Sequence, residues 1–319
     1  MLGNSGDAVL DDALEPLLAF LKRKNLVELS CNRPGEIWSE IAGEGWRCDS
    51  APALSLKHWS KLCYILANKA GQRFDIEEQP FVSTRLPGGH RFEANLGKSV
   101  RSGVSVSIRM KRKIQLEYAD FGLAGEDLAR VLDDIAGGAN VVISGGTSSG
   151  KTTLFNKMIE AIPSDRRIIS MEDTAELDVP HRNRVEHDLA RHSDGGSVGY
   201  AEKFDHAMRS RPDQILLGEL SMKNAFPALL LLNSGHRGFM MTMHADSAHL
   251  ALEEGFYQRI ALSGHGNVGQ EYLASYLRKT VDLVIQIAKV ERDKRRITEL
   301  WWPVRGEHRY LTEKGALAA

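Results

Sequence analysis

Cysteine and net charge are both scarce in this chain of 319 residues. It contains only three cysteines, Cys31, Cys48 and Cys63, at spacings that match no metal-binding motif, so we expect reduced thiols and no disulfide framework. The formal net charge is −1, from 41 lysines and arginines against 42 acidic residues. A protein whose main task is to coat nucleic acid carries a strong basic excess, so this class is disfavoured and no sequence-specific nucleic-acid binding is expected.

Long apolar runs are missing as well. The longest, FPALLLLN at 226–233, is too short to cross a bilayer. The first ten residues, MLGNSGDAVL, lack the basic stretch and the apolar core of a signal peptide. We therefore expect a cytoplasmic protein whose contact with a membrane is peripheral or made through partners.

The pattern of apolar residues changes after residue 113. Residues 1–113 mix predicted helices with strand-like runs around the turn LPGG, and we expect an α+β domain with an antiparallel sheet. Residues 114–127 have no strong period and are interpreted as a linker. From 128 to 319, short apolar strands alternate with helices, which is typical of an α/β domain with a parallel sheet covered on both faces. Its last part, DLVIQIAKVERDKRRITELWW, predicts a hairpin with a charged turn.

The segment GGTSSGKT fits the phosphate-binding pattern G-x-x-x-x-G-K-[ST], with the strand-like run NVVI before it and a predicted helix after it. Glycines let the main-chain N–H groups point at phosphate oxygens, and the N-terminus of the helix adds positive potential. Lys151 supplies a cation for the β- and γ-phosphates, Thr152 offers a hydroxyl to Mg²⁺, and Thr153 can reach the α-phosphate. The alternative, an ordinary Gly/Ser turn, does not explain the flanking elements. The predicted ligands are ATP and Mg²⁺, and the predicted binding residues here are Gly145, Gly146, Thr147, Ser148, Ser149, Gly150, Lys151, Thr152 and Thr153.

Acidic residues follow two other predicted strands. Glu172 and Asp173 come after RIISM, and Glu219 comes after DQILLG. In an open parallel sheet ligands bind beyond the carboxyl ends of the strands, so these acids are expected near the nucleotide. The alternative is that each acid only caps a helix that follows its strand.

Two histidines accompany the next predicted strand. His236 precedes the run FMMTM and His244 ends it. A neutral histidine there can sense the γ-phosphate or hold a catalytic acid, and the alternative is a satisfied structural residue. No cluster of Cys, His and acidic residues suggests zinc.

Four segments in this order, GGTSSGKTT, SMEDTAEL, RPDQILLGEL and GHRGFMMTMHADS, resemble the traffic ATPases of bacterial type II and type IV secretion and pilus systems. In that family they are the Walker A motif, the Asp box, the Walker B motif and the His box. NRPGEIWSE and TRLPGGHRFEAN look most like the VirB-eleven branch of type IV secretion and conjugation. The resemblance runs from about Leu26 to Trp302.

The resemblance implies a RecA-like ATPase domain preceded by an N-terminal domain, assembled into a homo-hexameric ring with nucleotide at the junction of the domains. It also implies partners, namely other secretion ATPases and inner-membrane components, at the cytoplasmic face of the inner membrane. By similarity, Glu172 orients the attacking water, Glu219 holds Mg²⁺ through water, and His244 reports on the γ-phosphate. The implied catalytic residues are Lys151, Glu172, Glu219 and His244, and the implied arginines that close the site are Arg85, Arg91 and Arg109.

The chain departs from the family pattern at one position. Ser221 stands where the family usually has an arginine after the Walker B acid. The pairing of that arginine with a neighbouring subunit or with an acid of the Asp box would therefore be missing. Arg209 and Arg211 in MRSRPD keep the pattern and are candidates for the site or for an interface between subunits.

The resemblance therefore implies a hexameric ATPase that powers pilus assembly or the transport of protein or DNA by a type IV secretion or conjugation system. One alternative is a helicase-type motor stimulated by nucleic acid, suggested by the basic runs at 109–113 and 289–296, although these also fit a linker and a hairpin turn. A second alternative is a P-loop small-molecule kinase, for which the sequence shows neither a lid nor an acceptor pocket.

Overall fold

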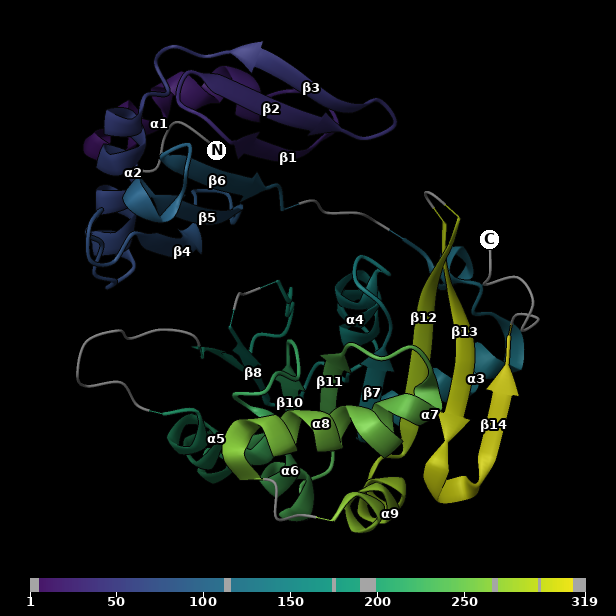
Figure 1. Ribbon diagram of the computed structural model, residues 1–319. Helices are drawn as coiled ribbons and strands as arrows, with labels where there is room; N and C mark the ends of the chain where they lie inside the picture. The colour runs from purple at the N-terminus through teal and green to yellow at the C-terminus, as the bar shows by residue number, and fades with distance from the viewer. Residues whose placement is uncertain are drawn as a thin grey trace. The chain divides into compact units, whose positions relative to one another are not determined.

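The computed structural model describes residues 6–111, 116–173, 176–189, 199–265, 269–291 and 294–311. These residues form two compact units, one before and one after residues 112–115 of the chain, and each is described by itself (Figure 1). None of the helices described in these ranges is long and apolar enough to cross a membrane.

The N-terminal unit is an antiparallel sheet with two helices packed on one face. Its strand order is β3-β2-β1-β6-β5-β4. The strands are β1 (Leu26–Cys31), β2 (Glu36–Ile41), β3 (Gly45–Ser50), β4 (Phe81–Arg85), β5 (Arg91–Leu96) and β6 (Val104–Arg109), and the helices are α1 (Ala8–Leu21) and α2 (Leu56–Lys69). Alternate residues of the strands are buried with the apolar faces of the helices in one core, which leaves the other face of the sheet polar.

The helices of this unit follow local sequence signals. Helix α1 buries Leu10, Leu14, Leu17 and Leu21, which are spaced three or four residues apart. The side chain of Asp7 caps its start by accepting hydrogen bonds from two main-chain N–H groups, as capping residues do.

The C-terminal unit is built on an eight-stranded sheet in the order β14-β13-β12-β7-β11-β10-β8-β9. The strands from β12 to β9 run parallel, and β13 and β14 are antiparallel additions. The bounds are β7 (Val141–Ser144), β8 (Ile168–Glu172), β9 (Arg184–Asp188), β10 (Gln214–Leu217), β11 (Phe239–Met243), β12 (Leu283–Glu291), β13 (Lys294–Trp302) and β14 (Glu307–Tyr310). The predicted α/β class and the predicted hairpin, β12 and β13, are confirmed.

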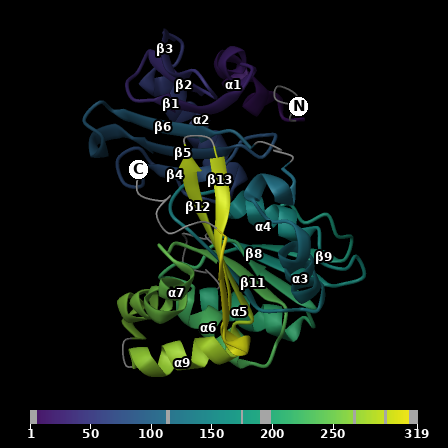
Figure 2. The same ribbon diagram turned by 90° about the vertical axis from the view of Figure 1, so that its right-hand side faces the viewer.

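Helices cover both faces of this sheet, and the central strands are buried for that reason. The helical segments are α3 (Gly125–Ala136), α4 (Lys151–Ile159), α5 (Tyr200–Arg209), α6 (Ala225–Asn233), α7 (Ala248–Leu250), α8 (Phe256–Ile260) and α9 (Gln270–Thr280), with two π-helical turns, η3 (Ala251–Gly255) and η4 (Ala261–His265). Figure 2 shows α3 and α4 on one side of the sheet and α6, α7 and α9 on the other, in agreement with two separate apolar clusters.

Part of the stretch interpreted as a linker packs with the C-terminal unit. A short 3-10 helix, η2 (Tyr118–Phe121), precedes α3, and Phe121 and Leu123 are buried in the cluster beneath α3 and α4. The Tyr118 hydroxyl donates a hydrogen bond to the carbonyl oxygen of Lys157 at 2.9 Å. The low periodicity of this segment reflects its shortness, because a single turn of helix shows no repeat.

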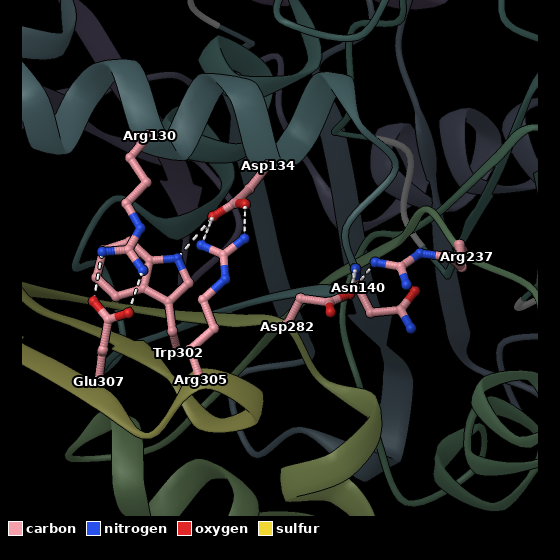
Figure 3. Close-up of polar contacts among 8 residues, drawn as sticks. All are labelled: Arg130, Asp134, Asn140, Arg237, Asp282, Trp302, Arg305 and Glu307. Atoms are coloured by element: carbon pink, nitrogen blue, oxygen red, sulfur yellow. Dashed lines mark hydrogen bonds and ion pairs between the residues drawn. The ribbon is translucent and has the colours of Figure 1, made fainter.

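Polar contacts tie the strands added after β12 to helix α3, as Figure 3 shows. The Arg130 guanidinium donates to both carboxylate oxygens of Glu307, at 2.6 and 2.8 Å, and lies over the ring of Trp302. The Trp302 indole N–H donates to Asp134, which also pairs with Arg305. The antiparallel edge of the sheet is thus anchored by charge-assisted bonds as well as by apolar packing.

Candidate active site

The phosphate-binding loop connects β7 to α4, and its glycines are required for two different reasons. A Cβ atom on Gly145 would lie 2.2 Å from the carbonyl oxygen of Ile287, because the loop passes directly against β12. Gly150 has φ = 95°, a left-handed conformation that glycine adopts without strain. The loop therefore has a fixed path that no larger side chain at these two positions would permit.

Lys151 is the first residue of α4, and its side chain is buried against the loop. The ammonium group donates to the carbonyl oxygens of Gly145 and Gly146, at 2.9 and 2.8 Å. Burial lowers the pKa of Lys151, and the nearby carboxylate of Glu219 opposes this shift. Lys151 is thus a cation held in place by the main chain of the loop.

Three side chains from three separate segments meet beside the loop. The Lys151 ammonium lies 3.2 Å from Nδ1 of His244, and Nε2 of His244 lies 3.0 Å from a carboxylate oxygen of Glu219. An ammonium can only donate, so Nδ1 is the acceptor and Nε2 carries the proton that Glu219 accepts. We call Lys151, His244 and Glu219 the polar chain. It stands at the carboxyl ends of β7, β10 and β11, which are neighbours in the sheet.

Glu172 ends β8 at the same edge, and it is 5% exposed. Its Oε1 accepts hydrogen bonds from the main-chain N–H groups of Glu176 and Leu177, at 2.7 and 2.9 Å. Gly218 allows this packing, because a Cβ atom there would lie 2.9 Å from Cγ of Glu172. The carboxylate is therefore anchored to the loop that follows its own strand.

The second acid of the Asp box, Asp173, contacts a helix. It accepts a hydrogen bond from the hydroxyl of Tyr200 at 2.7 Å. Burial raises the pKa of that hydroxyl, and the hydrogen bond to Asp173 raises it further. Tyr200 begins α5, so Asp173 links the end of β8 to this helix.

Three other residues considered from the sequence lie at the amino ends of the parallel strands, away from the carboxyl ends that carry the polar chain. His236 is in the turn before β11, and Arg211 is in the turn before β10. Arg209 ends α5 and pairs with Asp205 at 3.0 Å. Within this unit, none of the three is placed with the phosphate-binding loop.

Three of the arginines of the N-terminal unit, those implied to close the site, form one row across adjacent strands. Arg85 is directly opposite Arg91, and Arg91 is directly opposite Arg109, on the polar face of the sheet. Arg91 also pairs with Glu93 at 3.0 Å, and Glu28 follows Arg109 in the row on β1. Like charges directly opposite are unfavourable, and Glu28 and Glu93 beside the row offset part of this repulsion.

Several polar residues that sequence reasoning missed hold the loops around the polar chain. Gln286 on β12 accepts a hydrogen bond from the hydroxyl of Ser144 and donates one to the carbonyl oxygen of Ala245 at 3.1 Å. Asn224 accepts from the N–H of Ser221 at 2.8 Å and donates to the carbonyl oxygen of Glu219 at 2.9 Å. The loop at Ser221, where the family usually has an arginine, is thus closed by an amide. Neither amide belongs to a recognisable motif, so no local pattern identifies them in advance.

The model of the family described as "Type II/IV secretion system protein" matches residues 13–286. The chain belongs to this family. Among its relatives is the type IV secretion system protein VirB11 of Bartonella quintana, 31% identical over 94% of this chain and 95% of the relative. The probable conjugal transfer protein TrbB of Sinorhizobium fredii is 34% identical over 90% of this chain and 86% of the relative.

Solved structures of this family agree with the fold. The VirB11 ATPase of Brucella suis is 25% identical, with a TM-score of 0.50, over 93% of this chain and 96% of that one. The ATPase DotB of Legionella pneumophila is 19% identical with a TM-score of 0.62, which supports the fold alone. The resemblance drawn from the four motifs is confirmed, and the family member described here is a nucleotide-binding ATP hydrolase of the type IV secretion kind.

Proposed function

We propose that the chain forms a homo-hexameric ring at the cytoplasmic face of the inner membrane. There it hydrolyses ATP with Mg²⁺ to drive pilus assembly or the transport of protein or DNA. The observation that carries the catalytic part is the polar chain, which joins the phosphate-binding lysine to the ends of two neighbouring strands. The names of the relatives, which include secretion and conjugal transfer proteins, support the wider role.

The residues present fit Mg²⁺. Thr152 and Glu219 are hard oxygen donors, and no cluster of three or more His, Cys, Asp or Glu side chains suited to a metal occurs among the residues with described positions. A site with only one or two protein oxygens suits Mg²⁺, because this ion takes its other ligands from phosphates and water. Thr152 would hold Mg²⁺ through its hydroxyl and Glu219 would hold it through water, and the bound ion would neutralise charge on the phosphate oxygens.

Glu172 is proposed to orient the attacking water. The anchoring of its Oε1 by two main-chain N–H groups fixes the orientation of the carboxylate, as catalysis by positioning requires. His244 is proposed to report on the γ-phosphate, because it contacts both the phosphate-binding lysine and Glu219. A change at either neighbour would alter its hydrogen bonds.

The arginine row of Arg85, Arg91 and Arg109 is proposed to close the site when nucleotide is bound. Guanidinium groups bind phosphate in a bidentate manner and neutralise charge that develops in the transition state. Closing and reopening of the site would convert hydrolysis into motion.

No structural observation favours the helicase-type alternative. Arg296, in one of the two basic runs that suggested it, donates both of its described hydrogen bonds to the carbonyl oxygens of Ala119 and Asp120, at 2.9 Å each. This part of the run therefore stabilises the fold of the C-terminal unit.

Replacement of Lys151 by alanine tests the proposal. We expect Lys151→Ala to lower ATP turnover by at least about 100-fold, because it removes the buried cation of the phosphate-binding loop. Phosphate release measures turnover, and native mass spectrometry should show the same assembly, a hexamer, for the variant and the wild-type protein.

The matched control is Lys157→Ala. Lys157 lies on the same helix, but it pairs with Glu117 and Glu160. Turnover by this control should stay within about twofold of wild type, as expected for a charge outside the site. Retention of turnover by Lys151→Ala would contradict the assignment of the site, and a strict monomer under all conditions would contradict the ring.

A further inference from the structure

The loops after β10 and β11 carry Glu219 and His244, and one side chain outside both loops connects them. Arg259, on α8, donates from Nε to the carbonyl oxygen of Leu220 at 3.0 Å. Its second terminal nitrogen donates to the carbonyl oxygen of His244 at 3.2 Å. Leu220 directly follows Glu219 in the chain, so Arg259 contacts the main chain at or next to both residues.

The third contact of Arg259 fixes the guanidinium to its own helix. The remaining terminal nitrogen donates to the carbonyl oxygen of Gly255 at 2.8 Å. A guanidinium presents its donors in a rigid planar fork, so three acceptors in different directions define both its place and its orientation. The two loops are therefore held relative to α8 as well as to each other.

The helix that carries Arg259 is irregular at this point. Gly255 ends the π-helical turn η3, and a Cβ atom there would lie 2.5 Å from Cε of Met243, at the end of β11. The helix thus packs closely against the side chain of Met243 at this turn. Single π-helical turns are frequent at functional sites, and here the turn brings a guanidinium under two loops of the active site.

The charge of Arg259 also reaches the site. Burial lowers the pKa of the guanidinium, and the carboxylate of Glu219 opposes this shift. The same charge contributes to the lowered pKa of Lys151, after the larger effect of burial. An arginine stays protonated at neutral pH, so it is a constant positive charge behind the polar chain.

We propose that Arg259 is a positioning residue for hydrolysis, which locks the Glu219 loop and the His244 loop into one unit. Binding of nucleotide depends on the phosphate-binding loop, to which Arg259 makes no described hydrogen bond. Turnover depends on the placement of Glu219 and His244, which Arg259 controls. The inference rests on the proposed function of these two residues.

The test separates binding from turnover. The variants Arg259→Gln and Arg259→Lys are compared with wild type by the Kd for a fluorescent ADP analogue and by kcat and KM for ATP. For Arg259→Gln we expect Kd and KM within about threefold and kcat lowered about 10- to 100-fold, since misplacement by about 1 Å can have such an effect. Arg259→Lys keeps the positive charge but lacks the planar set of guanidinium donors. Its kcat should lie between those of wild type and Arg259→Gln.

The control for helix stability is Arg278→Gln. Arg278 pairs with Glu253 in the same π-helical turn but contacts neither loop. Suppose that Arg259 only stabilised the helix. Then Arg278→Gln and Arg259→Gln would lower kcat equally wherever they lower the Tm by the same amount. We expect Arg278→Gln to keep kcat within about twofold of wild type.

A double mutant tests whether Arg259 acts through His244. We expect Arg259→Gln combined with His244→Ala to turn over no more slowly than the slower single variant, because both changes disable one unit. Full additivity, or an unchanged kcat in Arg259→Gln, would overturn the inference. If Arg259→Gln does not fold, an unchanged kcat in Arg259→Lys overturns it. The proposed function is tested separately by Lys151→Ala. If Lys151→Ala loses turnover but the Arg259 variants keep the kcat of wild type, only this inference is refuted.

Discussion

At the residue scale, adjacent glycines in the phosphate-binding loop have different roles. A Cβ atom on Gly145 would lie 2.2 Å from a carbonyl oxygen of β12, whereas one on Gly146 would meet nothing within 4 Å. The motif pattern alone does not distinguish the two, since both are glycines at the start of the same loop. The distinction comes from β12, which is more than a hundred residues away in the sequence.

These two glycines provide a matched pair of variants. We expect Gly145→Ala to lower the free energy of unfolding by about 1–3 kcal/mol, because the main-chain oxygen that it meets cannot move aside. Gly146→Ala should change it by less than about 0.5 kcal/mol. Urea unfolding measures both, and equal effects of the two variants would show that the loop does not follow this path against β12.

At the element scale, the antiparallel edge of the large sheet depends on charged contacts with α3. The hydrogen bond from Arg130 lowers the pKa of Glu307 below its ordinary value of 4.5, and burial opposes this only in part. A carboxylate whose pKa is lowered by folding contributes stability above its unfolded pKa and loses it as the pH falls through its folded pKa. The attachment of β14 is therefore sensitive to acid.

This dependence leads to a prediction for Glu307→Gln. The variant should have a lower Tm than wild type at pH 7, and the difference should begin to shrink as the pH falls below about 4.5 and vanish below the lowered pKa of Glu307. Thermal unfolding followed across this pH range measures it. Glu291→Gln removes an exposed pair with Lys294 and should show almost no difference at any pH. A difference for Glu307→Gln that persists in acid would rule out this ion pair as its cause.

At the scale of the whole molecule, the polar chain and the arginine row belong to different units of the chain. The polar chain lies at the carboxyl ends of parallel strands in the C-terminal unit. The arginine row consists of residues directly opposite one another on adjacent strands of the N-terminal unit. In the proposed function both act on the same nucleotide, so replacement of an arginine of the row should affect turnover more than the stability of its own unit.

Replacement of Arg109 tests this division of roles. Arg109→Ala should lower ATP turnover by about 10-fold or more, because an arginine that neutralises transition-state charge can be worth far more than that. The Tm should change little, since the variant removes a like charge opposite Arg91 and an unlike charge opposite Glu28, and the two effects oppose each other. Arg73→Ala, which removes an exposed pair with Glu78, is the control and should leave turnover unchanged. Normal turnover in Arg109→Ala would argue against the arginine row as part of the site.

The sequence by itself determined the features that depend on neighbouring residues. The phosphate-binding loop is a run of eight residues between a strand and a helix, and its local pattern predicts both its shape and its ligand. The order of short apolar strands and helices likewise predicted the α/β class, because burial on both faces leaves a local signature. The four ordered motifs predicted the family.

Only the tertiary structure decided which distant side chains meet. Strand order placed His244 between Lys151 and Glu219. Packing of α8 under two loops gave Arg259 its three acceptors, although no motif marks it. A hydrogen bond forms only within about 3 Å, and such proximity between remote residues follows from the packing of the whole chain rather than from any local pattern.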